Sequence, residues 1–302
     1  MAVPAQMTEL LAVWREISGD ADRQVPVNLY APLDASRDAL RLMFLAGSAY
    51  PETLNILELG PTHPPEADLH LVMVEASYGP SGQDLGALKR LPPGSLLLLL
   101  VMPDERLQDA RRREVAATAG VRADRVVVAG SVSELRPLLA RRLTALFKDH
   151  AVSLARQFPF VREEAVSQEI AATSQQNAMV GVIPVPGADL PVMTLNQIKM
   201  VMRLATIHDQ PLSYERLREV LAVVGGGFAL RTVARQVAKL IPGPGWLVAG
   251  GLGYAGTLAM GKAAAEYFRR SAKGAPGSPA LGPDGRPVID TKATVVDPTE
   301  PA

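Results

Sequence analysis

The sequence has no cysteine, few aromatic residues and no excess of charge of either sign. The absence of cysteine excludes disulfides, thiolate metal sites and cysteine nucleophiles. Aromatic residues make up 5% of a chain that is 48% hydrophobic, so its core must consist mainly of Leu, Val and Ala. Basic and acidic residues number 31 each, which gives no general attraction to nucleic acid or to anionic lipid.

Histidine is also scarce, and its four positions show no metal-ligand spacing such as HExxH. No pattern indicates acid–base or nucleophilic catalysis, so we expect no catalytic residue, no metal and no cofactor. The segment from Met1 to Gln6 lacks the basic and apolar parts of a signal peptide, which favours a cytoplasmic protein.

Residues 23–150 alternate between apolar strand-like runs and helical patterns, which indicates a parallel sheet covered on both faces. This predicts a three-layer α/β domain with about five strands. Residues 1–22 precede it as an amphipathic helix, which we expect to pack on the domain that follows. The five expected strands are Val25–Tyr30, Leu54–Leu59, Asp68–Glu75, Leu96–Met102 and Arg125–Ala129.

Ligands of such sheets bind at the loops that follow the strands, so the first loop was compared with the phosphate-binding motif GxxxxGK[S/T]. Ala31 and Ser36 stand at the glycine positions, Arg37 stands at the lysine, and Asp38 stands at the hydroxyl residue. Without the glycines and the lysine, and with a carboxylate added, the loop is a poor site for a polyanion.

The order of elements resembles the G domain of Era-like GTPases, a P-loop fold. On that resemblance Glu58 matches the DxxG aspartate, with Pro61 replacing its glycine, and Asp104 matches the base-reading aspartate of NKxD. The segments that would carry the magnesium-binding threonine and a normal switch region are too short. The resemblance therefore implies a degenerate G domain that does not hydrolyse GTP. Ser36, Arg37, Asp38, Glu58 and Asp104 are its site remnant, and Asp104 has the alternative role of a helix N-cap.

The C-terminal half reads as helical, with residues 151–176 as a connecting helical segment and 177–270 as a helical domain. An Ile-Pro-x-Pro-Gly phrase occurs twice within it, at 183–187 and 241–245. Paired prolines end a helix and glycine allows a sharp turn, so each phrase predicts an elbow between helices. The elbow residues are Pro184, Pro186, Gly187, Asp189, Pro242, Gly243 and Gly245.

Residues 240–261 are uncharged and long enough to span a bilayer, but they are rich in glycine. Ala249, Gly253 and Thr257 give this segment a face of small residues for close helix contact. A buried hairpin, a membrane-inserted segment and a partner interface all remain possible interpretations of this segment.

The helical domain resembles the family named Domain of Unknown Function 697. The resemblance rests on Val180–Asp189, Asn196-Gln197, Met200, Lys239–Gly245 and Ala265–Phe268. In that family the domain often follows an Era-like GTPase domain, some members are predicted membrane proteins, and no reaction is assigned. Residues 271–302 follow as a tail without apolar periodicity, expected to be disordered.

These patterns favour a non-catalytic, pseudo-GTPase-type adaptor or scaffold with a helical domain for membrane or protein association. Two alternatives remain: a nucleotide-binding regulator that uses Arg37 and Asp104, and a membrane-inserted oligomerising protein. The expected partners are another protein, a second copy of the chain, or a membrane contacted through 178–195 and 240–261. The expected location is the cytoplasm or the cytoplasmic face of a membrane. No nucleic-acid partner is expected.

Overall fold

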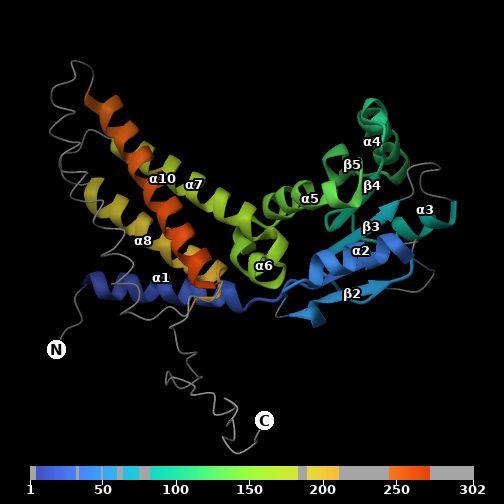
Figure 1. The fold of residues 1–302 in the computed structure, drawn as a ribbon, viewed down its shortest axis with the longest axis horizontal. Helices are drawn as coiled ribbons and strands as arrows, with labels where there is room; N and C mark the ends of the chain where they lie inside the picture. The colour runs from blue at the N-terminus through green and yellow to red at the C-terminus, as the bar shows by residue number, and fades with distance from the viewer. Residues whose placement is uncertain are drawn as a thin grey trace, which may run out of the picture.

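The computed structural model describes residues 5–31, 34–48, 50–59, 64–74, 82–182, 189–210 and 245–272 (Figure 1). The helices are α1 (Ala5–Asp22), α2 (Asp34–Leu45), α3 (Gly82–Leu88), α4 (Glu105–Ala119), α5 (Val132–Leu146), α6 (Ala151–Gln157), α7 (Arg162–Val182), α8 (Asp189–Ile207) and α10 (Gly245–Ala272). The strands are β1 (Val27–Tyr30), β2 (Leu54–Leu57), β3 (Leu69–Val74), β4 (Leu96–Val101) and β5 (Val126–Ala129).

The five strands form one parallel sheet in the order β2-β1-β3-β4-β5. This confirms the predicted five-stranded parallel sheet, and each strand lies within two residues of its expected bounds. The order 2-1-3-4-5 is that of doubly wound folds, which place ligands beyond the carboxyl ends of the strands where the order reverses. Here that position lies between β1 and β3.

Helices cover the sheet on both faces because successive side chains of each strand point to opposite sides. On one face, Leu97 and Leu99 of β4 pack in a cluster with Phe44 of α2 and Leu139 of α5. On the other face, alternate strand residues such as Leu98 pack against α3 and α4. The result is the three-layer arrangement that the alternating sequence predicts.

The described residues from 151 onward are mostly helical, as expected, and α7 continues without a break through residues 176 and 177. Helix α1 belongs with these helices and not with the sheet, which corrects the expectation that it packs on the domain that follows it. Its buried Val13 and Ile17 contact Met202 of α8, and its Glu16 accepts a hydrogen bond from Arg203 at 3.3 Å. The first helix of the chain therefore completes the helical region formed by the last ones (Figure 1).

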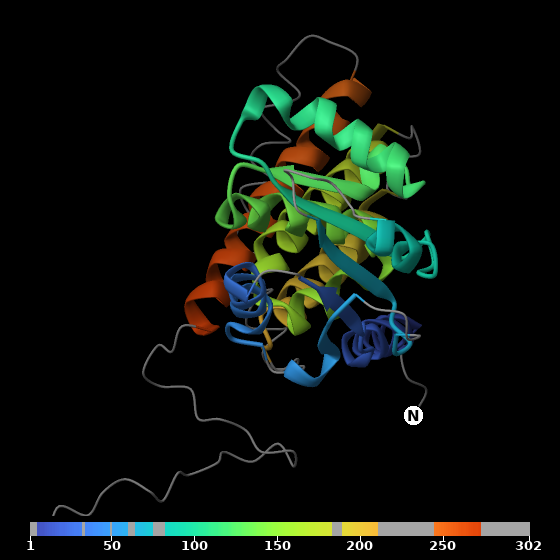
Figure 2. The ribbon, with the colours of Figure 1, turned by 90° about the vertical axis from the view of Figure 1, so that its right-hand side faces the viewer.

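A compact joint fastens this helical region to the sheet. The Gln157 side chain accepts a hydrogen bond from the Val25 N–H at 2.7 Å and donates to the Val25 carbonyl, just before β1. Arg156 donates to the Ala21 carbonyl at 2.7 Å and to the Asp209 carboxylate at 3.0 Å. Three segments of chain meet here, and the strands start at the joint and run away from it (Figures 1 and 2).

Helices α7, α8 and α10 approach one another closely because α10 presents small residues to the other two. A Cβ added at Gly253 would lie 2.8 Å from the Asn177 backbone oxygen of α7, and one at Gly261 would lie 2.8 Å from the Ile170 side chain. Gly253 and Thr257 of the predicted small-residue face are both buried. Ala249, the third member of that face, has a side chain outside the described residues.

The predicted elbows lie mostly outside the described residues, as does the predicted disordered tail beyond Ala272. Asp189 is the first residue of α8, and Gly245 is the first residue of α10. Among the described helices, none combines the length and the apolar character that crossing a membrane requires.

The close approach at Gly253 gives a first testable prediction. Gly253→Ala should lower the free energy of unfolding by about 1–3 kcal/mol, because the added methyl group meets backbone atoms that cannot shift cheaply. Gly251 lies two residues earlier on the same helix, and a Cβ added there has open space around it, so Gly251→Ala is the matched control. It should stabilise the helix by about 0.5–1 kcal/mol, since alanine is the better helix former.

Urea unfolding followed by far-ultraviolet circular dichroism measures both variants. Equal effects of the two substitutions would show that α10 does not pack on α7 through this face.

Candidate functional site

The loops after the strands are the first candidate site, and they lie at the edge of the sheet that faces away from the helical region (Figure 1). Arg37 follows β1, Glu58 follows β2 and Asp104 follows β4. Glu58 and Asp104 fall on opposite sides of β1, and β4 is two strands away from β1, or roughly 10 Å at normal strand spacing. The remnant residues share an edge but do not converge on one point.

Arg37, the expected phosphate-binding cation, turns back onto its own loop. Its Nε and Nη2 donate to the Ala31 carbonyl at 3.1 and 3.0 Å, where β1 ends. The guanidinium is partly buried in this position and satisfies a carbonyl at the mouth of the loop. Ser36 beside it is partly buried, and Asp38 is exposed one residue further along α2. A phosphate bound here would meet that exposed carboxylate and would have to compete for the guanidinium with the carbonyl.

Asp104 serves as the N-cap of α4, the alternative role weighed for it from the sequence. Its Oδ1 accepts a hydrogen bond from the Arg106 N–H at 3.0 Å. Its backbone is extended, as an N-cap requires. Replacing this contact with a base contact would leave the first turn of α4 without its cap. Glu58 is exposed after β2.

The loop after β5 is held in a similar way, by side-chain hydrogen bonds at the start of α5. Ser131 is the N-cap, and its Oγ accepts from the Glu134 N–H at 3.3 Å. Glu134 Oε2 accepts from the N–H of Gly130, the residue before the N-cap, at 3.1 Å, so a carboxylate of the chain already takes that N–H. The sequence shows this S-x-x-E motif, and its role was missed.

A buried cluster of amide and hydroxyl groups joins α7, α8 and α10. Asn177 donates to Thr257 Oγ1 at 2.9 Å, Gln197 donates to the same oxygen at 2.9 Å, and Asn196 donates to Asn177 Oδ1 at 2.9 Å. Asn177, Gln197 and Thr257 are buried. Sequence patterns placed Asn177 only at the start of the helical domain and gave it no partner, because only the fold brings the three helices together.

The elbow residues predicted as interaction residues are not tested by this geometry. Pro184, Pro186, Gly187, Pro242 and Gly243 lie outside the described residues.

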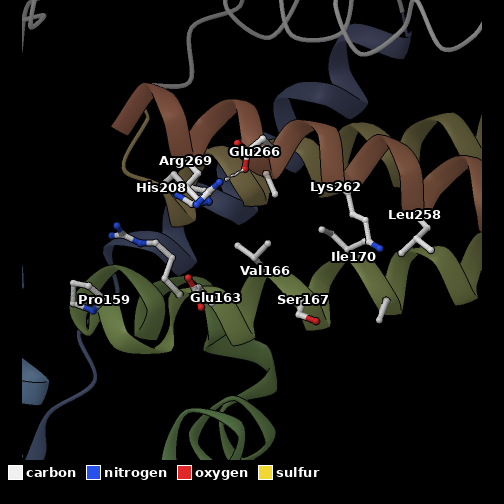
Figure 3. Close-up of a pocket in the computed structure, with 13 residues that line it drawn as sticks. Pro159, Glu163, Val166, Ser167, Ile170, His208, Leu258, Lys262, Glu266 and Arg269 are labelled. Carbon is white, nitrogen blue, oxygen red and sulfur yellow. Dashed lines mark hydrogen bonds and ion pairs between the residues drawn. The ribbon is translucent and has the colours of Figure 1, made fainter. Parts of the chain in front are cut away.

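A groove of about 750 Å³ runs between α7 and α10 and is the second candidate site (Figure 3). Val166 and Ile170 of α7 and Leu258 of α10 supply apolar surface. Charged groups surround it, with Glu266 accepting two hydrogen bonds from Arg269 at 2.8 and 2.6 Å. This volume is in the range of small-molecule pockets. The groove combines an apolar lining with charges of both signs.

His208 closes one end of this groove at the end of α8 (Figure 3). Burial, together with the nearby positive charges of Arg162 and Arg269, lowers the pKa of His208 to about 4, although the Asp209 carboxylate opposes the shift. The ring lies 6.5 Å from the ring of Phe268, measured between centroids. His208 is therefore a neutral, packed side chain at neutral pH.

The described residues contain no group of three or more His, Asp and Glu side chains placed to hold a metal ion. In the sheet, burial also lowers the pKa of His70, whose Nδ1 lies 3.4 Å from the Tyr30 hydroxyl. That pair lies within the strands, under the helices of one face, and away from the loops at the sheet edge.

The low pKa of His208 predicts how stability depends on pH. The unfolded chain takes up the proton near pH 6.5, whereas the folded chain does so only near 4, so this part of the stability is complete above about 6.5 and is lost as pH falls. Between about pH 7.5 and pH 5 the wild type should lose about 2 kcal/mol that His208→Gln does not lose.

Urea unfolding of both proteins at the two pH values measures the difference, in which the contributions of His70 and the carboxylates cancel. Parallel pH dependences would contradict a neutral, buried His208.

Three comparisons with known proteins bear on the chain. Over 71 residues the chain is 32% identical to Magnetosome membrane protein 22 of Magnetospirillum gryphiswaldense. The aligned part covers 22% of this chain and 36% of that relative. The chain thus spans about a third of the length of the curated relative it matches. No solved structure matches the chain.

The family comparison covers the helical region and begins at α6. Residues 151–283 match the family model described as Domain of unknown function (DUF697), as the resemblance in the sequence predicts. The match includes α6, α7, α8 and α10 and all the residues that line the groove of Figure 3. The C-terminal helical region of this chain is therefore similar to the DUF697 family over residues 151–283.

Proposed function

We propose that this protein is a non-catalytic adaptor, in which a G-domain-like sheet domain without nucleotide chemistry is attached to a membrane by its DUF697 domain. The absence of nucleotide chemistry from the sheet domain is inferred from the contacts of the polar groups at the carboxyl ends of the strands. Arg37 donates to a carbonyl, Asp104 caps α4, and Glu134 accepts from the Gly130 N–H in the loop before α5. Each group that could meet a nucleotide instead stabilises the loop that carries it.

Charge supports the same conclusion. Phosphoryl transfer depends on cations and backbone N–H groups placed around the transferring phosphate. At the first loop the guanidinium points to Ala31 while the Asp38 carboxylate is exposed, and at the last loop Glu134 occupies an N–H. The exposed Asp38 carboxylate at the first loop would repel a nucleotide triphosphate.

The membrane half of the proposal rests on the comparisons and on the form of the helical region. The relative that shares 71 residues with the chain is named as a membrane protein of the magnetosome. The match of 151–283 to DUF697 places the present helices in a family without an assigned reaction. An attachment role needs no chemistry, which fits both comparisons.

The joint between the two parts supports an adaptor over two independent modules. Asp209 ends α8 at a φ of 54° and accepts hydrogen bonds from Arg156 of α6 and from Arg162 of α7 at 2.9 Å. With the Gln157 contact to Val25, these bonds fix the sheet to the helices. A rigid joint would hold whatever binds the sheet at a set position relative to the membrane.

Nucleotide binding provides the first test. Adding GTP and magnesium should leave the melting temperature unchanged, because only a ligand that binds the folded state raises it. Bound at a hundredfold excess over its Kd, a nucleotide would add about 2.7 kcal/mol and shift the melting temperature by several degrees.

A rise that disappears in Arg37→Ala but remains in Arg41→Ala, an exposed arginine on the same helix, would contradict the proposal. That result would support the alternative of a nucleotide-binding regulator.

Membrane attachment provides the second test. Untagged full-length protein should sediment with the membrane fraction of its cells, and the purified protein should float with lipid vesicles on a density gradient. Protein found wholly in the supernatant without detergent, and unable to float with vesicles, would refute membrane attachment and leave protein association as the role of the DUF697 domain.

A further inference from the structure

Apart from Asp189, which begins α8 at the opposite end, the charged residues of α7, α8 and α10 lie at one end of the helical region. The last charge of α7 is Glu169, and no charge follows up to Val182. After its first residue, Asp189, α8 has no charge before Lys199, and α10 has none before Lys262. Each helix is therefore divided into a charged part and an uncharged part.

The three dividing points lie at one level of the bundle. Gly261 of α10 packs against Ile170 of α7, and it also lies next to Met200 of α8. These three residues are the sequence neighbours of Lys262, Glu169 and Lys199. The uncharged stretches therefore form one continuous end of the bundle, which we call the charge-free end: residues 170–182, 190–198 and 245–261. In Figure 1 it points away from the sheet.

The outer surface of the charge-free end is apolar. It carries four of the large hydrophobic side chains that are exposed in the described residues, namely Met179 (65% exposed), Val182 (40%), Val192 (46%) and Tyr254 (38%). The exposed polar side chains there include Gln175 and Gln176, which carry no charge. Several large apolar side chains exposed at one end of a molecule favour an interaction surface there.

Inside the charge-free end, the three helices are joined by hydrogen bonds between polar side chains. The cluster of Asn177, Asn196, Gln197 and Thr257 satisfies its members across the three helices, at the level of the close contact with Gly253. Small residues at helix contacts and hydrogen bonds between helices are the means by which helices associate in lipid, where an unsatisfied polar group is costly.

We propose that the charge-free end enters one leaflet of a lipid bilayer as a folded three-helix wedge. Glu169, Lys199 and Lys262 then lie at the level of the headgroups. This inference rests on the membrane attachment proposed above and adds its surface, its depth and its form. It requires no single helix to cross the bilayer.

The uncharged part of α8, residues 190–198, matches one leaflet in length, since it is about 14 Å long at 1.5 Å per residue. The uncharged parts of α7 and α10 are longer, about 20 Å and about 26 Å, so these two helices would have to tilt to stay within one leaflet. Half of a hydrocarbon core of about 30 Å is about 15 Å. The charges at the dividing level are of both signs, since Glu16 of α1 accepts from Arg203 and lies 3.9 Å from Lys199. Such a ring can stay hydrated among zwitterionic and anionic headgroups.

Because the chain has no cysteine, single cysteines can report on depth without background. An environment-sensitive fluorophore is placed at Met179→Cys, Val192→Cys and Tyr254→Cys, and at Ser167→Cys and Leu107→Cys as controls. The full-length proteins are mixed with vesicles of phosphatidylcholine containing some phosphatidylglycerol. The first three probes should shift to the blue, be quenched by nitroxide lipids and be protected from iodide, while the two controls stay exposed to iodide.

A second set of variants tests the energetics. Met179→Glu and Val192→Glu should each weaken vesicle binding by about tenfold or more, because a carboxylate would have to enter the hydrocarbon. Leu107→Glu, at an exposed apolar position on α4, should bind as the wild type does. Circular dichroism and the melting temperature confirm that each variant folds.

The outcomes separate the two proposals. If the protein floats with vesicles but the probes at the charge-free end stay in water, the wedge is wrong and membrane attachment stands. If the purified protein does not bind these vesicles, membrane attachment by the protein itself is wrong, and the wedge is wrong with it. If Met179→Glu lowers recovery with native membranes while purified protein ignores vesicles, the charge-free end binds a protein and the wedge is likewise refuted.

Discussion

The hydrogen bonds that converge on Thr257 Oγ1 are the constraint on which the helical region depends. Asn177 and Gln197 reach this oxygen from two other helices, and all three residues are buried. Removing the Thr257 hydroxyl would break both hydrogen bonds at once, at a cost of about 1–3 kcal/mol. Because hydrogen bonds also fix register, the cluster selects one packing of α7, α8 and α10, whereas small apolar residues alone would allow several.

The joint around Arg156 and Asp209 extends this order to the sheet. Phe44 of α2 packs edge-on against Phe158 and Phe160 at 5.0 and 4.9 Å between ring centroids, so the joint has an apolar core beneath its ion pairs. Helix α1 adds its own contacts from the other end of the chain. The sheet domain is thus held by segments that precede and follow it in the sequence, which restricts its motion about a single linker.

Sequence patterns were sufficient for the strands because each buried strand is a short, nearly pure apolar run, as at Leu96–Val101. They were also sufficient for the N-cap role of Asp104, which depends on neighbours in the chain. They failed for the partner of α1 and for Asn177, since both depend on contacts between residues far apart in sequence. The turn of Arg37 onto Ala31 is equally invisible in a motif comparison, which records residue types and not the direction of a side chain.

The direction of the strands has a consequence for how such a protein can change. All five strands run from the fastened edge of the sheet to its open edge, so every loop at the open edge begins and ends in an element that is anchored elsewhere. Insertions and substitutions in those loops would leave the joint, the sheet and the helical region intact. Relatives could therefore acquire different binding specificities at one end while they keep the same means of attachment at the other.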